Sequence, residues 1–221
     1  MKPATLKQAG KVLKLVEETE IPLEQLQKLL ASGLLSDLLN ANMDEINRDE
    51  FRKLCGLFPI STEFPIWKTI KLGTGLKSTD DSRKSIKKNG MKISDWASDI
   101  LGKPTFTTAA QETELDLVKV TVAELGFKKG ARREQIYIRA KELGLELCPS
   151  EVGPQLRLQY QDQPNGEWLL IAMEPITGSD GGLGVFSVER GGSGLWLRSD
   201  YGGPGNFWHP DAQWVFVRPR E

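Results

Sequence analysis

The last third of the chain consists of short strand-like runs separated by glycine-rich turns, and this pattern restricts the fold more than any other feature. The five expected strands are LRLQYQ (156–161), EWLLIAMEPI (167–176), VFSVER (185–190), LWLRSDY (195–201) and QWVFVRP (213–219). Short runs of this kind, joined by tight turns, are typical of antiparallel hairpins. We therefore expect a C-terminal antiparallel β-meander of about five strands, with one face covered by preceding helices.

The N-terminal part has a different pattern, with apolar residues at helical spacing over residues 3–58. Pro22 suits the first turn of a second helix, and Gly33 is expected to end it. A third helix can begin near Ser36, and Asn47 or Asp49 can cap a fourth. Residues 1–58 are therefore predicted to form a helical arm or bundle.

Two prolines, Pro59 and Pro65, interrupt regular structure and place a linker at about 59–65, before an α+β domain over 66–221. The domain is expected to begin with a mixed helical segment. Its predicted elements are a strand at WKTIKL (67–72), a helix from Thr79 to Asn89, a Ser94-capped helix at DWASDIL (95–101) and a helix at REQIYIRAKELG (133–144). LDLVKVTV (115–122) reads as a strand, with a helix continuing into AELGF as the alternative.

Length and composition set the class of protein. With 221 residues, 39% of them apolar, the chain can bury a core without disulfides. Its net charge of −1 gives no global attraction to nucleic acid or to an anionic membrane. Cys55 and Cys148 are far apart in sequence, which favours free thiols in a reducing compartment. Since no run approaches the roughly 18 apolar residues of a membrane span, we expect a cytoplasmic protein that does not associate with membranes.

Most familiar chemistries lack the residues that they require. His209 is the only histidine, and two unclustered cysteines offer no zinc pattern. Asp180, in ITGSDGGLG, is interpreted as part of a hairpin turn rather than as an oxygen ligand for a metal. A nucleophilic pair of Cys148 and His209 is disfavoured, because Leu147 and Pro149 suggest a buried thiol. The sequence predicts no catalytic residue, metal site or cofactor.

Charge is distributed unevenly along the chain. Residues 66–94 carry eight basic and two acidic side chains, a net of +6, whereas 143–221 carry ten acids and five arginines, a net of −5. Within the basic stretch 77–92 the candidates for a charge contact are Arg83, Lys84, Lys87 and Lys88. They can form a solvated helix face, contact the acidic half of the same chain, or bind a polyanion. Of the two possible contacts, we favour the one with the acidic half of the same chain over binding of a polyanion.

The loop DYGGPGNFWHPDAQW (200–214) is the second candidate region. Phe207, Trp208 and His209 are candidates for a ligand-binding or partner-binding loop, and the two rings are expected to be more exposed than the aromatic residues of the strands. We predict that the imidazole of His209 is structural, hydrogen-bonded within the loop and packed beside Trp208 or Trp214.

Four stretches resemble a group of bacterial proteins of unassigned function. They are WKTIKLGTGLKSTDD, ISDWASDILGKPTFT, ELGLELCPSEVGPQLRLQY and EWLLIAMEPI. The resemblance runs from about residue 22 to the C-terminus, and it implies one continuous bacterial, soluble unit. It implies no activity, cofactor or site.

These observations favour a non-enzymatic cytoplasmic protein that binds a macromolecular partner, most simply another protein. An enzyme, hydrolase-like, with a cleft between helices and sheet is the alternative, and it would show convergent polar groups in a deep pocket. A nucleic-acid-binding protein that uses the stretch 77–92 is a further alternative. It is not favoured, because aromatic residues are not interleaved with these lysines for stacking on bases.

Overall fold

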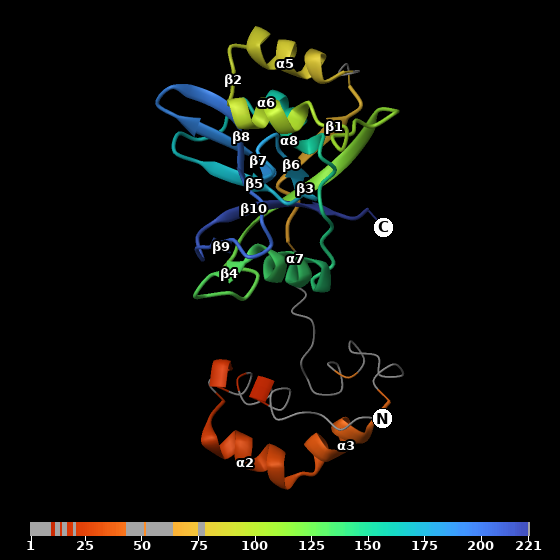
Figure 1. The fold of residues 1–221 in the computed structure, drawn as a ribbon, viewed down its shortest axis with the longest axis vertical. Helices are drawn as coiled ribbons and strands as arrows, with labels where there is room; N and C mark the ends of the chain where they lie inside the picture. The colour runs from red at the N-terminus through yellow and green to blue at the C-terminus, as the bar shows by residue number, and fades with distance from the viewer. Residues whose placement is uncertain are drawn as a thin grey trace. The chain divides into compact units, whose positions relative to one another are not determined.

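The computed structural model of the protein describes residues 10, 11, 14, 17–19, 21–42, 51, 64–74 and 78–220 (Figure 1). The chain divides into two compact units, Met1–Phe58 and Pro59–Glu221. Most of the predicted fourth helix, which Asn47 or Asp49 would cap, lies outside the described residues, as do the linker residues 59–63 and Cys55. In the described part of the chain, every helix is too short or too polar to cross a membrane.

Two helices are described in the first unit, and they follow the predicted order. Helix α2 (Leu23–Ala31) begins directly after Pro22, and α3 (Leu34–Asn40) follows it. Gly33 joins them with a φ of 76°, a left-handed conformation that glycine adopts without steric cost. The prediction that α2 ends at this glycine is confirmed.

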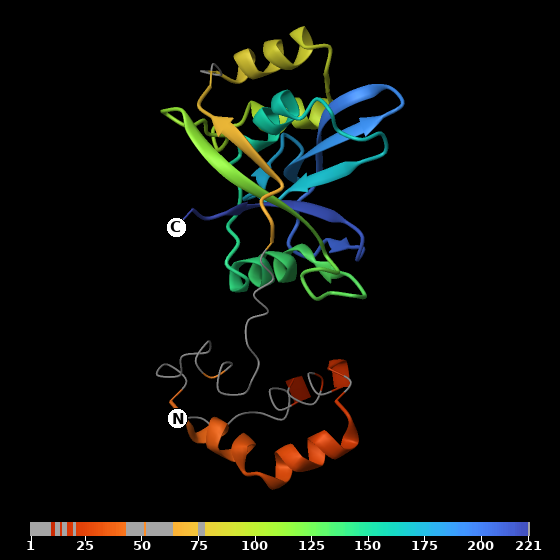
Figure 2. The ribbon, with the colours of Figure 1, turned by 180° about the vertical axis from the view of Figure 1, so that it is seen from behind.

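The second unit is built on one large, mixed and curled sheet (Figures 1 and 2). Its strands are β1 (Lys68–Leu72), β2 (Lys92–Ile93), β3 (Thr113–Thr121), β5 (Trp168–Ile171), β6 (Ile176–Thr177), β7 (Leu183–Gly191), β8 (Gly194–Tyr201) and β10 (Gln213–Arg218). Seven of them follow the order β1-β3-β10-β5-β7-β8-β2, and β6 pairs with β7. Strands β4 (Ala131–Arg132) and β9 (Phe207–Trp208) form a separate two-stranded sheet.

The predicted C-terminal five-stranded antiparallel meander is wrong. Among the described strands of the last third of the chain, β5, β7 and β8 form an antiparallel run, and the short β6 adds only a two-residue antiparallel pairing with β7. The last strand, β10, lies between β3 and β5, antiparallel to β3 and parallel to β5, and β2 is parallel to β8. Strand β10 can occupy the middle of the sheet because residues 214–217 are all buried. Hairpin patterns did not predict that the last strand would pair with β3, which comes much earlier in the chain.

Helices cover both faces of this sheet. Helices α5 (Thr79–Lys88), α6 (Asp95–Leu101) and α8 (Val152–Gln159) lie on one side, and α7 (Arg133–Glu142) lies on the other, in both views (Figures 1 and 2). Ser78 and Ser94 accept hydrogen bonds from the third backbone N–H of α5 and α6, respectively, as N-cap residues do. The helices predicted at 79–89, 95–101 and 133–144 are confirmed, and LDLVKVTV is a strand.

The predicted strand LRLQYQ is also wrong, because residues 152–159 form helix α8. Its alternating pattern indicated a strand with one polar face, but Arg157 is fully buried. The guanidinium donates to Gln163 Oε1 at 2.5 Å and to the carbonyl of Tyr160. Because Tyr160 is the C-cap of α8, this buried side chain bonds a carbonyl at the end of the helix. Burial of this cation lowers its pKa to about 10.

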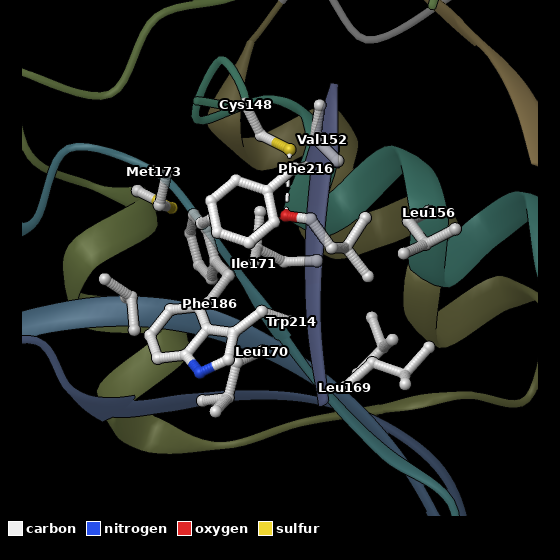
Figure 3. Packing of buried hydrophobic residues seen from close by; sticks show 14 of the residues in the cluster. Cys148, Val152, Leu156, Leu169, Leu170, Ile171, Met173, Phe186, Trp214 and Phe216 are labelled. Carbon is white, nitrogen blue, oxygen red and sulfur yellow. Dashed lines mark hydrogen bonds between the residues drawn. The ribbon is translucent and has the colours of Figure 1, made fainter. Parts of the chain in front are cut away.

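Large apolar side chains from β5, β7 and β10 meet those of α8 in the core (Figure 3). Trp214, Phe186 and Phe216 are fully buried. Helix α8 approaches the sheet closely because Gly153 faces Phe186: a Cβ on this glycine would lie 2.6 Å from ring carbons. Cys148 lies in the same core and donates from Sγ to the carbonyl of Val215 at 3.3 Å.

A buried carboxylate joins three segments beside this core. Glu151, fully buried, accepts hydrogen bonds from the backbone N–H of Gly73 at 2.9 Å and of Ala109 at 2.7 Å. The side chain of Gln155 donates a third bond at 2.9 Å. Among the residues that the structure describes, no cation pairs with this carboxylate. Amide donors alone therefore stabilise the charge in the interior.

Candidate binding site at the end of strands β7 and β8

A cavity of about 230 Å³ opens where β7 begins and β8 ends, beside α6 and the turn at residues 178–182. Trp96 and Ile100 line it from α6, Asp180 from the turn, and Ser199 and Tyr201 from β8. Its volume is below the roughly 300–1,000 Å³ of most small-molecule sites. The cavity therefore suits one side chain or a group of similar size.

Two large aromatic rings are exposed at this cavity. Trp96 is 57% exposed and Tyr201 is 61% exposed, although both lie in regular elements that pack on the core. Tyr201 lies against Gly203, where an added Cβ would be 2.6 Å from a ring carbon. Exposed rings on otherwise packed elements are typical of surfaces that bind a partner or ligand.

The turn beside the cavity is fixed to α6. The Asp99 carboxylate accepts from the backbone N–H of Ser179 at 2.7 Å and from its hydroxyl at 2.6 Å. Lys103 Nζ lies 3.1 Å from the same carboxylate. The Ser179 hydrogen bonds, assisted by Lys103, lower the pKa of Asp99 to about 2, so it is charged at neutral pH. These hydrogen bonds hold the turn against α6, and the cavity beside the turn remains open.

Glycines keep space open along the turn and the start of β7. An added Cβ would lie 2.9 Å from Asp180 Oδ1 at Gly178 and 3.2 Å from it at Gly182. At Gly184 an added Cβ would lie 2.6 Å from Ser199 Oγ. Larger residues at these positions would displace the groups that line the cavity.

Two carboxylates are part of the lining, and they differ in their partners. Asp180 Oδ1 accepts from the backbone N–H of Gly182 at 2.9 Å, and the side chain is otherwise exposed. Asp200 accepts from Trp168 Nε1 at 3.2 Å and from Ser187 Oγ at 2.5 Å. Side chains alternate along a strand, so these partners place the Asp200 carboxylate on the opposite face from Ser199. Asp180 is the carboxylate available to a ligand in the cavity.

The predicted basic residues lie on α5, away from this lining. Arg83 pairs with Asp80 at 2.8 Å on its own helix and donates to the carbonyl of Ser98 at 2.7 Å. Lys84, Lys87 and Lys88 are exposed, and no carboxylate within the described ranges forms an ion pair with them. The favoured contact with the acidic half of the chain is not seen for these three lysines.

The predicted loop residues separate into exposed and buried ones. Phe207 is 60% exposed, whereas Trp208 is buried between Trp168 and Trp214, with centroids at 5.8 and 5.2 Å. The imidazole Nδ1 of His209 accepts from the backbone N–H of Asp211 at 3.4 Å, which confirms the hydrogen bond within the loop. The predicted packing of His209 is wrong, since its side chain is 76% exposed.

The structure places the Cys148 thiol and the His209 imidazole at different depressions. Cys148 borders a broad depression of about 760 Å³ at the C-terminal end of α7, and His209 borders a different one of about 350 Å³. Burial raises the pKa of the Cys148 thiol, so the reactive thiolate is suppressed. Within the described residues, His, Cys, Asp and Glu side chains form no group of three or more that could hold a metal ion. In the described part of the chain, Cys148 and His209 therefore do not line the same depression.

Sequence reasoning missed the cavity. Trp96 and Tyr201 were placed correctly in a helix and a strand, but nothing marked their rings as exposed. Local spacing offered no signal for Trp96, because this residue lies one helical turn before Ile100, whose side chain is buried.

Comparisons with known protein families, with the curated proteins and with the solved structures each found no match. The functional interpretation therefore depends on the geometry of this chain alone.

Proposed function

We propose that this protein is a non-enzymatic binding protein whose partner is another protein, and that the cavity bordered by Trp96 and Tyr201 is its contact site. The observation that supports this proposal is the pair of exposed rings around an opening sized for one side chain. Aromatic residues dominate the energy of protein interfaces, usually as a few central anchors that surround or fill a pocket.

Panning a random peptide display library against the immobilised full chain tests the proposal. Peptides enriched over an unrelated control protein would be synthesised and their affinity measured by calorimetry. We expect Trp96→Ala and Tyr201→Ala each to weaken binding at least tenfold, because truncation of an interface anchor costs about 2 kcal/mol or more.

Phe207→Ala is the matched control, since this ring is 60% exposed but lies in β9, outside the cavity lining. All three variants must retain the urea midpoint of the unchanged protein. Failure to enrich any peptide, or equal affinity for the unchanged protein and both cavity variants, would refute the proposal.

Nucleic acid is a second candidate partner because Lys84, Lys87 and Lys88 have no carboxylate opposite them in the described structure. The ring of Trp196, which pairs with β2 just after α5, argues against it: Lys92 Nζ and the Arg198 guanidinium lie 5.2 and 4.5 Å from its centroid, so cations already cover this ring. Binding to mixed-sequence DNA and RNA at about 50 and 200 mM salt decides this, since phosphate contacts predict a steep loss of affinity. Loss of that binding on changing the three lysines to glutamate would support a nucleic-acid partner.

A further inference from the structure

Strand β8 leaves part of its outer edge without a neighbouring strand. Strand β2 pairs only with Trp196 and Leu197, and the chain then turns away at Ser94, whose N–H donates to the carbonyl of Leu197 at 3.0 Å. Backbone groups point to the same edge at every second residue, so those of Ser199 face outward as well. No strand within residues 78–220 pairs with Ser199 on this side, and Ser199 lines the cavity.

The opposite end of the sheet is closed in a different way. On the outer edge of β1, Gln159 Oε1 accepts from the backbone N–H of Lys71 at 3.0 Å, and Gln159 Nε2 donates to the backbone carbonyl of Lys71 at 2.8 Å. This side chain replaces the missing strand neighbour, a known means of blocking an exposed edge. Among the described residues, no side chain covers the Ser199 edge of β8 in this way, which leaves it available for pairing with an added segment.

The chemistry around the cavity favours a cation. Asp95 and Asp180 are exposed and form no ion pair with a described residue, while the charge of Lys103 is balanced by Asp99 at 3.1 Å. Aromatic faces attract a guanidinium or ammonium group, and a carboxylate beside them adds a charge-assisted hydrogen bond. Arginine fits best, since its planar group can stack on a ring and donate in two directions.

We infer that the occupant is an extended peptide segment of a partner protein that pairs with Ser199 at the free edge of β8 and places an arginine side chain between Trp96 and Tyr201, against Asp180. This inference rests on the proposed function and specifies its ligand. Side chains of Ser199 and Tyr201 project from the same face of β8, toward α6, because they are two residues apart. An added strand can direct one side chain to that face from the edge.

The peptides enriched by panning on the full chain test this inference. We expect an arginine at a fixed position in a β-prone segment, and at least a tenfold loss of affinity when citrulline, its neutral isostere, replaces it. Asp180→Asn should reduce the difference between the two peptides to less than threefold. Glu174→Asn is the control, because this exposed carboxylate lies outside the cavity, and it should preserve the full difference.

A second measurement tests the edge pairing. N-methylation of the peptide at one backbone position next to the arginine should abolish binding, whereas methylation one residue further should not, because ladder bonds alternate along a strand. If peptides lose affinity in Trp96→Ala but bind equally with citrulline, or tolerate methylation at both positions, the inference is wrong although the proposed function stands. If no peptide depends on Trp96 or Tyr201, both fail.

Discussion

Replacing Glu151 by glutamine should destabilise the second unit although the side chain keeps its size. The carboxylate accepts three hydrogen bonds, two at Oε1, from Gly73 and Gln155, and one at Oε2, from Ala109. Glutamine offers one acceptor oxygen, so its NH₂ group must face at least one of these N–H donors. The substitution therefore leaves a donor without a partner and converts the other bonds from charge-assisted to neutral.

The magnitude follows from these bonds. An unpaired buried donor costs about 1–3 kcal/mol, and hydrogen bonds to a charged group are worth about 1.5–3 kcal/mol against about 0.5–1.5 for neutral ones. Neutralisation also removes the cost of burying a charge, which offsets part of the loss. We expect Glu151→Gln to lower the free energy of unfolding by about 2–3 kcal/mol.

Urea unfolding followed by tryptophan fluorescence measures this change. With a slope of about 1–3 kcal/mol per molar urea, the midpoint should fall by roughly 1 M or more. Glu174→Gln provides the control, because this glutamate is exposed and should change stability by no more than about 0.5 kcal/mol. An unchanged midpoint for Glu151→Gln would mean that the three hydrogen bonds only offset the cost of burying the carboxylate. The proposed stabilising role of Glu151 would then be wrong.

Three other predictions follow from the packing and charges of the second unit. Gly153→Ala should destabilise by about 1–3 kcal/mol in urea, because its Cβ would overlap a buried ring, whereas Gly192→Ala, which meets nothing within 4 Å, should be neutral. Arg220 lowers the pKa of Asp116 from 3.8 to about 2, so this carboxylate stabilises the fold above pH 4 and the contribution is lost as the pH falls toward 2; acid titration of Asp116→Asn should lack that component. In a Cys55→Ser background, iodoacetamide should label Cys148 only after unfolding, and rapid labelling of the native protein would contradict its burial.

Local patterns predicted most single elements of the second unit but not their arrangement. The capped helices at Ser78 and Ser94 depend on residues three positions apart, so the sequence shows them directly. The position of β10 between β3 and β5 depends on pairing with residues 44 positions away in β5 and 92 to 102 positions away in β3, which no local signal specifies. The apolar run at residues 214–217 was the available hint, because it is compatible with burial on both faces, but it does not identify the neighbouring strands.

Helix α8 shows a different reason for failure, since its local pattern pointed to the wrong element. Leucines at 156 and 158 with Arg157 between them are typical of a strand that has one wet face. The structure buries all three side chains to some extent, because Arg157 donates to Gln163 and to the Tyr160 carbonyl in the interior. A buried charged residue that is hydrogen-bonded inside the protein removes the polar face on which the pattern depends.

Sequence patterns could not predict the candidate site because its residues, like the strands beside β10, are distant in sequence. Trp96, Asp180 and Tyr201 come from a helix, a turn and a strand end that only the folded sheet brings together. Each has a bland local interpretation: a ring in a short helix, an acid in a hairpin turn, a tyrosine ending a strand. The Asp99–Ser179 contact fixes the helix to the turn, so changes that loosen this contact should weaken binding at the cavity without removing any residue that lines it.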